Sequence, residues 1–154
     1  MIDSPHAAGR SRWRATAVRA LLVAVVMVGA MCSVRASSTI DVRRGGSLWA
    51  SIESDGDIRL NGRLVGKFES DGAVRRNGSL VGSIECDGTV RKHGMLYGEI
   101  ERDGTLRVHG SIVGQIESDG TIRRHGALWG SAESFHRGDA HAVAAVLMFF
   151  CEDF

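Results

Sequence analysis

The chain has 154 residues, of which 24% are charged and 44% are hydrophobic, the length and composition of one folded domain. Five of its 19 Lys and Arg and one of its 18 Asp and Glu lie in residues 1–36, so 14 basic and 17 acidic side chains remain beyond them. This acidic balance excludes nucleic acid as the expected partner, because nucleic-acid binding requires a basic surface.

Residues 1–36 have the layout of a secretory signal peptide. Arginines between Arg10 and Arg19 precede an apolar run from Ala20 to Met31, and Val34 and Ala36 supply small residues at the spacing that signal peptidase requires. The run is shorter than the roughly 20 residues of a membrane-spanning helix. We therefore predict a secreted or periplasmic protein, cleaved after Ala36 and without a membrane span after cleavage. An uncleaved signal anchor in the inner membrane is the alternative.

A sixteen-residue unit then repeats from Arg43 to Glu133. It reads R-x-[N/H]-G-x-L-[V/W/Y]-G-x-I-E-x-D-G-x-I. A fixed short period indicates one small supersecondary unit that is copied and stacked. We predict an all-β repeat domain over residues 37–133, followed by an apolar tail over residues 134–154 that packs on it.

The Asp-Gly pairs predict the first turn of each unit. A three-residue loop at 70–72, closed by a left-handed glycine, pairs Phe68 with Val74 and keeps apolar residues on one face. The equivalent turn glycines are Gly56, Gly72, Gly88, Gly104 and Gly120.

For the second turn we predict a three-residue loop at 76–78, which pairs Val74 with Leu80. Phe68, Val74 and Leu80 would then lie side by side on the buried face. Each unit becomes a petal, a short three-stranded antiparallel meander.

A further glycine column falls inside the strands. Its members are Gly66, Gly82, Gly98, Gly114 and Gly130, with Ala50 in the equivalent place once. Glycine within a strand marks a bend or a close approach of backbone. We expect these glycines to let a strand pass from one petal to the next near the axis of a ring.

Five units are complete and a sixth is split between the chain ends. Residues 41–43 and 47–49 match the last two strands of a unit, and residues 131–133 match its first strand. Pairing the two parts satisfies their backbone groups and removes the exposed edges. We predict that Val42 lies opposite Ala132, with Trp49 near Trp129. An open array or a β-solenoid is the alternative.

The tail is apolar nearly all round between Ala140 and Phe150 and is too short to span a bilayer. We predict a short helix that packs on, or plugs, one end of the ring.

The repeated I-E-x-D-G-x-I-R-x-N-G-x-L-V-G pattern, between a signal sequence and an Ala/Phe-rich tail, resembles the bacterial four-fold and five-fold β-flower proteins. The resemblance covers roughly residues 38–150. It implies an exported domain and supplies no catalytic residues. The chain departs from those proteins by carrying five complete units and part of a sixth.

The repeated charges and histidines are expected to be structural. A glutamate and an arginine recur in every unit, as in Glu69 and Arg75, and predict a solvated ladder of diagonal neighbours on the outer face. His93, His109 and His125 occupy turn positions that Asn61 and Asn77 occupy in earlier units, and turns tolerate histidine. The Asp-Gly turns offer too few oxygen ligands for calcium, so we expect no metal site and no cofactor.

The aromatic residues Trp49, Tyr97 and Trp129 form the best candidate binding site. They share a repeat position with valines, on the face expected to carry the charged ladder. Exposed aromatic rings beside charges suit a sugar or a protein partner, whereas packing against arginine stems or the tail is the alternative.

No arrangement of residues indicates catalysis, since there is no Ser/His/Asp or Cys/His pattern and no phosphate loop. We predict a non-enzymatic structural or binding module at the bacterial cell envelope, whose partner is an envelope glycan or protein. A glycan- or peptide-binding module that uses the aromatic face and a self-assembling envelope protein are the alternatives. Whether Cys86 and Cys151 form a disulfide is left open.

Overall fold

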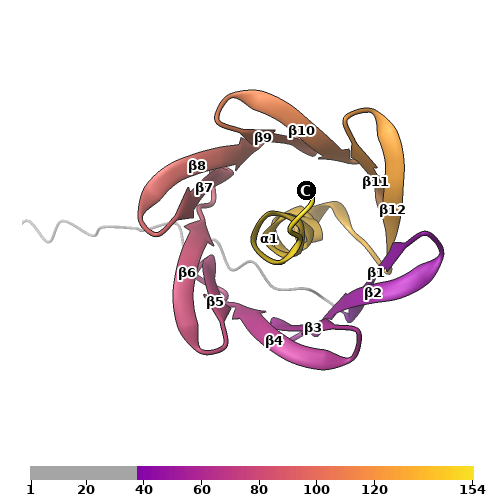
Figure 1. Cartoon of the computed structure of the whole chain (residues 1–154), viewed down its shortest axis with the longest axis horizontal. Coiled ribbons are helices and arrows are strands. Elements are labelled where there is room, and N and C mark those ends of the chain that lie inside the picture. Colours follow the sequence, from indigo (N-terminus) through magenta and orange to yellow (C-terminus); the bar gives the residue numbers. More distant parts are fainter. Residues whose placement is uncertain (1–37) are drawn as a thin grey trace, which may run out of the picture.

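The computed structural model describes residues 38–154, and the predicted signal peptide lies outside this part of the chain. Twelve antiparallel strands follow one another around a single closed barrel, and β1 pairs with β12 to complete it (Figure 1). The strands are β1 Ile40–Arg44, β2 Ser47–Ile52, β3 Asp57–Leu60, β4 Arg63–Phe68, β5 Ala73–Arg76, β6 Ser79–Ile84, β7 Thr89–Lys92, β8 Met95–Ile100, β9 Thr105–Val108, β10 Ser111–Ile116, β11 Thr121–Arg124 and β12 Ala127–Glu133.

The Asp-Gly turns have the geometry that the sequence predicts. Phe68 pairs with Val74 across β4 and β5. Glu69 N donates to Ala73 O at 2.8 Å, and Gly72 N donates to Glu69 O at 3.0 Å. Gly72 has φ +90°, in the left-handed region where a side chain is disfavoured. The turn therefore keeps Phe68 and Val74 on one buried face.

The prediction for the second turn was wrong. Arg76 pairs with Ser79, so the loop contains only Asn77 and Gly78, at φ +49° and +81°. This is the turn that suits the twist of a two-residue hairpin, in which both central residues have positive φ. Val74 then faces Gly82, and the register shifts between Val74 and Arg75. As a result Leu80 leaves the core and is 58% exposed.

The predicted closure of the ring is confirmed. Val42 pairs with Ala132 in the antiparallel ladder between β1 and β12, and the ring centroids of Trp49 and Trp129 are 5.2 Å apart. Arg43 Nε lies 2.7 Å from Glu133 Oε1 across the same seam. The open array and the solenoid are therefore excluded for the described residues, because no strand of the barrel is left as an edge.

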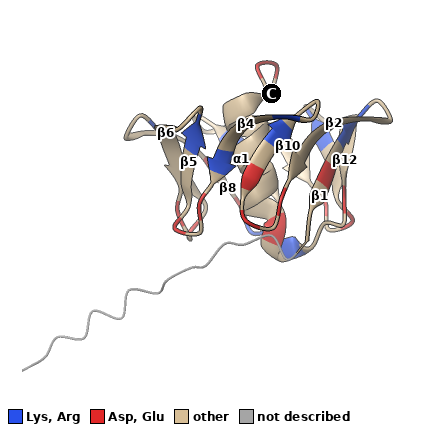
Figure 2. Ribbon diagram, turned by 90° about the horizontal axis from the view of Figure 1, so that it is seen from below, with Lys and Arg blue, Asp and Glu red and all other residues tan. Residues whose placement is uncertain are grey.

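The predicted C-terminal helix is also present, but it lies inside the bore rather than on one end of the ring. The 3-10 helix η1, Arg137–Asp139, leads into α1, Ala140–Phe150, which runs along the barrel axis (Figures 1 and 2). Its buried residues are Ala142, Val143, Ala144, Ala145, Val146, Leu147, Met148 and Phe150. They form one hydrophobic core with the inward residues of the strands, such as Val74 and Ile84. A helix that is apolar on all sides suits an apolar wall on all sides.

The glycines inside the strands provide the space for this packing. A Cβ atom added at Gly82 would lie 2.1 Å from Arg91 O and 2.5 Å from Phe149 Cε1. At Gly66 and Gly114 it would lie 2.5 Å from the Cζ atoms of Phe150 and Phe154. The strand that contains Gly82 continues to Ile84. These glycines therefore let the aromatic rings of the tail approach the barrel wall.

Candidate functional site

The two ends of the barrel differ in charge. We call the end that carries the two-residue turns the tip end, and the end that carries the Asp-Gly loops the loop end (Figure 2). The residues that directly flank the six tip turns include five cations and no acid, and these cations are Arg44, Arg63, Arg76, Lys92 and Arg124. The loops at the other end carry one aspartate each, namely Asp55, Asp71, Asp87, Asp103 and Asp119.

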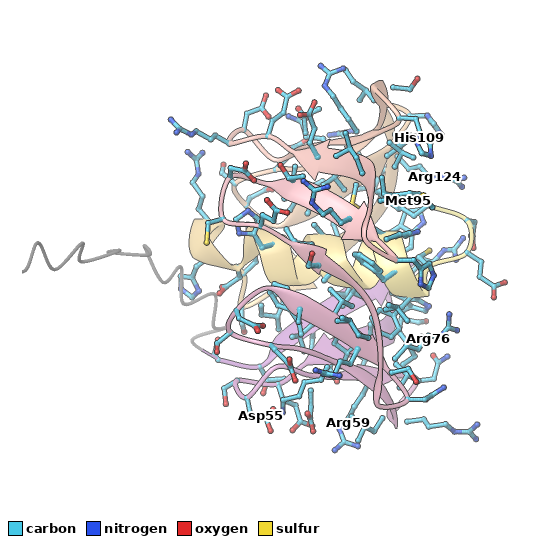
Figure 3. The ribbon with its side chains drawn as sticks, turned by 90° about the vertical axis from the view of Figure 1, so that its left-hand side faces the viewer. Asp55, Arg59, Arg76, Met95, His109 and Arg124 are labelled. Carbon is cyan, nitrogen blue, oxygen red and sulfur yellow. The ribbon has the colours of Figure 1, made fainter. Side chains whose placement is uncertain are left out.

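A set of large apolar side chains is exposed around the tip end. We call this set the apolar collar, and it consists of Leu48, Leu64, Leu80, Met95, Leu96, Ile112 and Leu128. Their exposed fractions run from 45% for Leu48 to 72% for Met95. Figure 3 shows Met95 at the same end of the barrel as His109, Arg76 and Arg124. The collar was not predicted from the sequence, because the expected three-residue loop placed the leucine column in the core. The Asn-Gly pairs are the signal for a two-residue turn, which exposes that column.

The aromatic candidates lie just behind the collar and are half-buried. Trp129 packs edge-on against Trp49 and, at a centroid distance of 5.7 Å, against Phe154 of the tail. The ammonium of Lys92 lies 3.7 Å from the ring centroid of Tyr97. Trp49 and Trp129 therefore form one pair, whereas Tyr97 makes separate contacts with Lys92 and, at 5.4 Å between ring centroids, with His109.

Cations of the tip end also surround the end of helix α1. Arg44 lies 5.1 Å from the ring centroid of Trp129 and forms an ion pair with Asp153, while Arg76 lies 5.8 Å from the ring of Phe150. The ammonium of Lys92 lies 5.4 Å from the ring centroid of Phe149. Positive charge at this place is favourable, because the last carbonyl groups of a helix carry partial negative charge.

The charged ladder on the outer wall follows the prediction. Arg75 Nε lies 3.0 Å from Glu69 Oε1, and Arg91 Nε lies 2.6 Å from Glu85 Oε1. The same contact recurs in the pairs Arg43–Glu133, Arg59–Glu53, Arg107–Glu101 and Arg123–Glu117. These side chains are about one-third to one-half exposed, so each pair stabilises the fold by at most about 1 kcal/mol.

The turn histidines have the backbone conformation of a tip turn. His93, His109 and His125 have φ values of +49°, +48° and +47°, and each is followed by a left-handed glycine. Asn61 and Asn77 have the same conformation in the earlier units. Among non-glycine residues, asparagine, aspartate and histidine adopt this conformation most readily. The geometry explains the histidines without a metal ion.

Replacing the three turn histidines tests this interpretation. The triple variant His93→Asn, His109→Asn and His125→Asn should unfold at the parent temperature or slightly above it, because asparagine tolerates positive φ at least as well. His93→Val alone should cost about 1–3 kcal/mol, because a β-branched residue is strained there. Thermal unfolding by circular dichroism measures both. Equal loss of stability in the two variants would show that the imidazoles stabilise the fold by some interaction other than their tolerance of positive φ.

The aspartates of the loop end cap their own turns. In three of the loops the Oδ1 atom of the aspartate accepts a hydrogen bond of 2.8–2.9 Å from the backbone N–H of the threonine two residues later. The aspartates are Asp87, Asp103 and Asp119. These bonds are the main reason that the pKa of each carboxyl is lowered below its ordinary value of 3.8. In the first loop Glu53, Asp55 and Asp57 lie close together. Lys67 lies 2.8 Å from Asp57, and Arg59 pairs with Glu53, so the cluster already holds its counter-charges.

The lowered pKa values predict a loss of stability in acid. A carboxyl whose pKa is lower in the folded state stabilises the fold above its unfolded pKa, and this contribution is lost as the pH falls through the folded pKa. Thermal stability should therefore decrease as the pH falls below about 4. The variant Asp87→Asn, Asp103→Asn and Asp119→Asn should be less stable at neutral pH and should lose less stability in acid. An identical acid slope in parent and variant would contradict this origin.

A cleft of about 590 Å³ lies at the loop end beside the start of α1. Its lining includes Cys86, Asp87, Asp103, Phe135 and His141. Burial lowers the pKa of His141, so its imidazole is more readily neutral than a free one. The cleft lies beside the start of α1, whereas Trp129 contacts Phe154, which follows the other end of that helix.

The two described cysteines are free thiols and do not form a disulfide with each other. Cys86 lies in a loop at the loop end, whereas Cys151 directly follows α1 at the tip end. A helix of 11 residues is about 16 Å long, which exceeds the reach of a disulfide. Burial raises the pKa of the Cys151 thiol.

Comparisons with models of protein families, with curated proteins and with solved structures found no match to this chain. No helix among residues 38–154 has the length and apolar character needed to cross a membrane. The strand order and the buried helix define the class of protein by its fold. It is a closed, twelve-stranded β-barrel with a helix inside it, built from a sixteen-residue repeat.

Proposed function

We propose that the chain is an exported, non-enzymatic β-repeat domain that acts as a structural or binding module at the bacterial cell envelope. The observation that carries the proposal is the apolar collar, seven large side chains that are 45–72% exposed at one end of the barrel. Apolar side chains gathered on a surface are typical of an interaction site. Helix α1 lies inside the bore and buries the inward apolar residues of the strands, so the large exposed apolar side chains of the described residues are those of the collar.

The resemblance to the β-flower proteins supports the same proposal. In that reading each sixteen-residue unit is one petal, the chain has six petals, and the signal peptide at residues 1–36 directs export. A catalytic site usually interrupts a repeat, whereas the charged pairs of this barrel recur in every unit. The domain therefore acts by binding or by its shape.

Two related functions have their own supporting observations. A glycan- or peptide-binding module is favoured by the half-buried pair of Trp49 and Trp129, whose rings contact each other at 5.2 Å beside the cation Arg44. A self-assembling envelope protein is favoured by the collar itself, because an exposed apolar surface can also bury against another copy.

The first experiment determines where the protein is and where it begins. Intact mass of the protein recovered from periplasm and medium should show a chain that starts at Ser37. A chain that still begins at Met1 and stays with the membrane fraction would contradict cleavage and favour the signal anchor.

The second experiment tests binding. Tryptophan fluorescence of the exported protein is measured against envelope sugars, peptides, lipids and an envelope extract. Its mass is measured by light scattering over a range of concentrations. A fluorescence change assigns a ligand to the aromatic face, and a rising mass assigns self-assembly. A monomer that responds to no sugar, peptide, lipid or envelope extract would contradict the binding function.

A further inference from the structure

We propose that the tip end of the barrel docks on the surface of an anionic phospholipid bilayer. The apolar collar enters the interfacial layer, and the cations beside the tip turns contact headgroup phosphates. This inference rests on the proposed function, since it names the partner of a binding module at the envelope.

The first support is the distribution of charge. Five cations and no acid directly flank the tip turns, and the loops at the opposite end carry five aspartates and one arginine, Arg102. Figure 2 shows basic residues on the strands toward the tip end and acidic loops at the loop end, together with an acidic segment after α1 that lies beyond the tip end. Of the two acids after helix α1, Glu152 and Asp153, the second is paired with Arg44. A molecule with this polarity approaches a negative surface with its tip end first.

The second support is that the cations lie beside exposed apolar side chains. Leu80 and Leu96 are 58% and 64% exposed, and they lie one or two residues from the turns that Arg76 and Lys92 flank. A soluble polyanion would use the cations and leave the collar in water. A bilayer interface accommodates both, because apolar side chains enter the acyl boundary while cations remain among the headgroups. The half-buried Trp49 and Trp129 lie close behind, and tryptophan is enriched at membrane interfaces.

The third support is the closure of the ring. Because β1 pairs with β12, all six tip turns lie at the same end of one closed wall. The collar can therefore meet a surface with several units at once, around the segment that follows α1 and extends beyond the tips in Figure 2. Weak contacts that are made together by a preformed array give much tighter binding than each contact alone.

A second copy of the chain fits the collar less well. The exposed large apolar side chains of the described residues all lie at the tip end, so head-to-tail stacking would bury leucines against the aspartates of the loop end. Tip-to-tip contact would bring two sets of cations together, which is repulsive.

The test uses the exported protein in vesicle flotation. Vesicles of phosphatidylcholine with about one-third phosphatidylglycerol should carry the protein upward, and vesicles of phosphatidylcholine alone should carry much less. Raising the salt concentration should weaken binding, because it screens the attraction of the cations to the headgroups. The collar variant Leu80→Ser, Leu96→Ser and Leu128→Ser should bind the anionic vesicles at least about tenfold more weakly.

A matched pair of variants separates position from charge. Arg76→Gln with Arg124→Gln removes two tip cations, whereas Arg102→Gln with Arg137→Gln removes the same charge from exposed positions at the loop end. The first variant should lose vesicle binding and the second should retain most of it. Circular dichroism confirms that each variant is folded, and the collar variant supplies the test if Arg76→Gln unfolds.

Four outcomes would overturn the inference. They are the absence of binding to anionic vesicles, equal binding by the collar variant and the parent, equal loss in the two arginine variants, and collar-dependent self-association without lipid. A fluorescence response to an envelope sugar without vesicle binding would overturn the lipid partner and leave the proposed function standing. No response to any envelope component would contradict the lipid partner and the binding function together, and would leave only a structural module.

Discussion

Replacing Gly82 by valine should destabilise the barrel by about 3 kcal/mol or more, because the new side chain has no space on the inner wall. Its Cβ would lie 2.1 Å from Arg91 O and 2.5 Å from Phe149 Cε1. The carbonyl oxygen belongs to the neighbouring strand and cannot move without breaking the ladder, so a rotation of the Phe149 ring alone would not relieve the overlap. Urea unfolding monitored by circular dichroism measures the loss.

Ser83→Thr is the matched control for this substitution. Ser83 is the next residue of β6 and faces the outer wall, where an added methyl group meets solvent and neighbouring polar side chains. Its effect should stay within about 0.5 kcal/mol. If Gly82→Val and Ser83→Thr have equal stability, the close approach between the wall and the tail does not limit the fold.

Truncating Leu147 to alanine should cost about 3–5 kcal/mol, because the side chain lies in the centre of the bore. Leu147 is fully buried in helix α1 and belongs to the same core as the inward residues of the strands. The barrel wall is held by its own closed ladder and can collapse only a little around a cavity. Denaturant unfolding should show a lower midpoint with a similar slope.

Leu128→Ala is the control, since it makes the same chemical change on the collar. Leu128 is 70% exposed, so its truncation should change the free energy of unfolding by no more than about 0.5 kcal/mol. A similar cost for Leu147→Ala and Leu128→Ala would show that the helix does not form the core of the barrel.

Several features follow from the sequence alone because they depend on local backbone conformation and on pairing of nearest neighbours. The Asp-Gly loop is one such feature. A left-handed Gly72 and the pairing of Phe68 with Val74 are compatible with only one register that keeps the apolar residues on one face. The Glu69–Arg75 contact follows from that register. Closure by Val42 and Ala132 follows from backbone groups that would otherwise stay unpaired.

The tip turn shows where local reasoning failed. Two-residue and three-residue loops both place the glycine at positive φ. The three-residue loop was predicted because it puts Val74 and Leu80 on one apolar face. The structure uses the two-residue turn with a register shift, because the bore needs Gly82, rather than Leu80, opposite Val74. The apolar collar is a consequence of the two-residue turn, whereas the three-residue loop would have buried its leucines in the core.

What the sequence by itself determined about this protein is the repeat, the loop at each Asp-Gly pair, the ladder of charges and the pairing of the chain ends. All of these arise from interactions within a unit or between adjacent units. Only the tertiary structure decided that helix α1 lies inside the bore, that the strand glycines make room for Phe149 and Phe150, and that the leucine column is exposed. Those features depend on the radius of the closed ring and on the segment that lies inside it, which no single unit specifies.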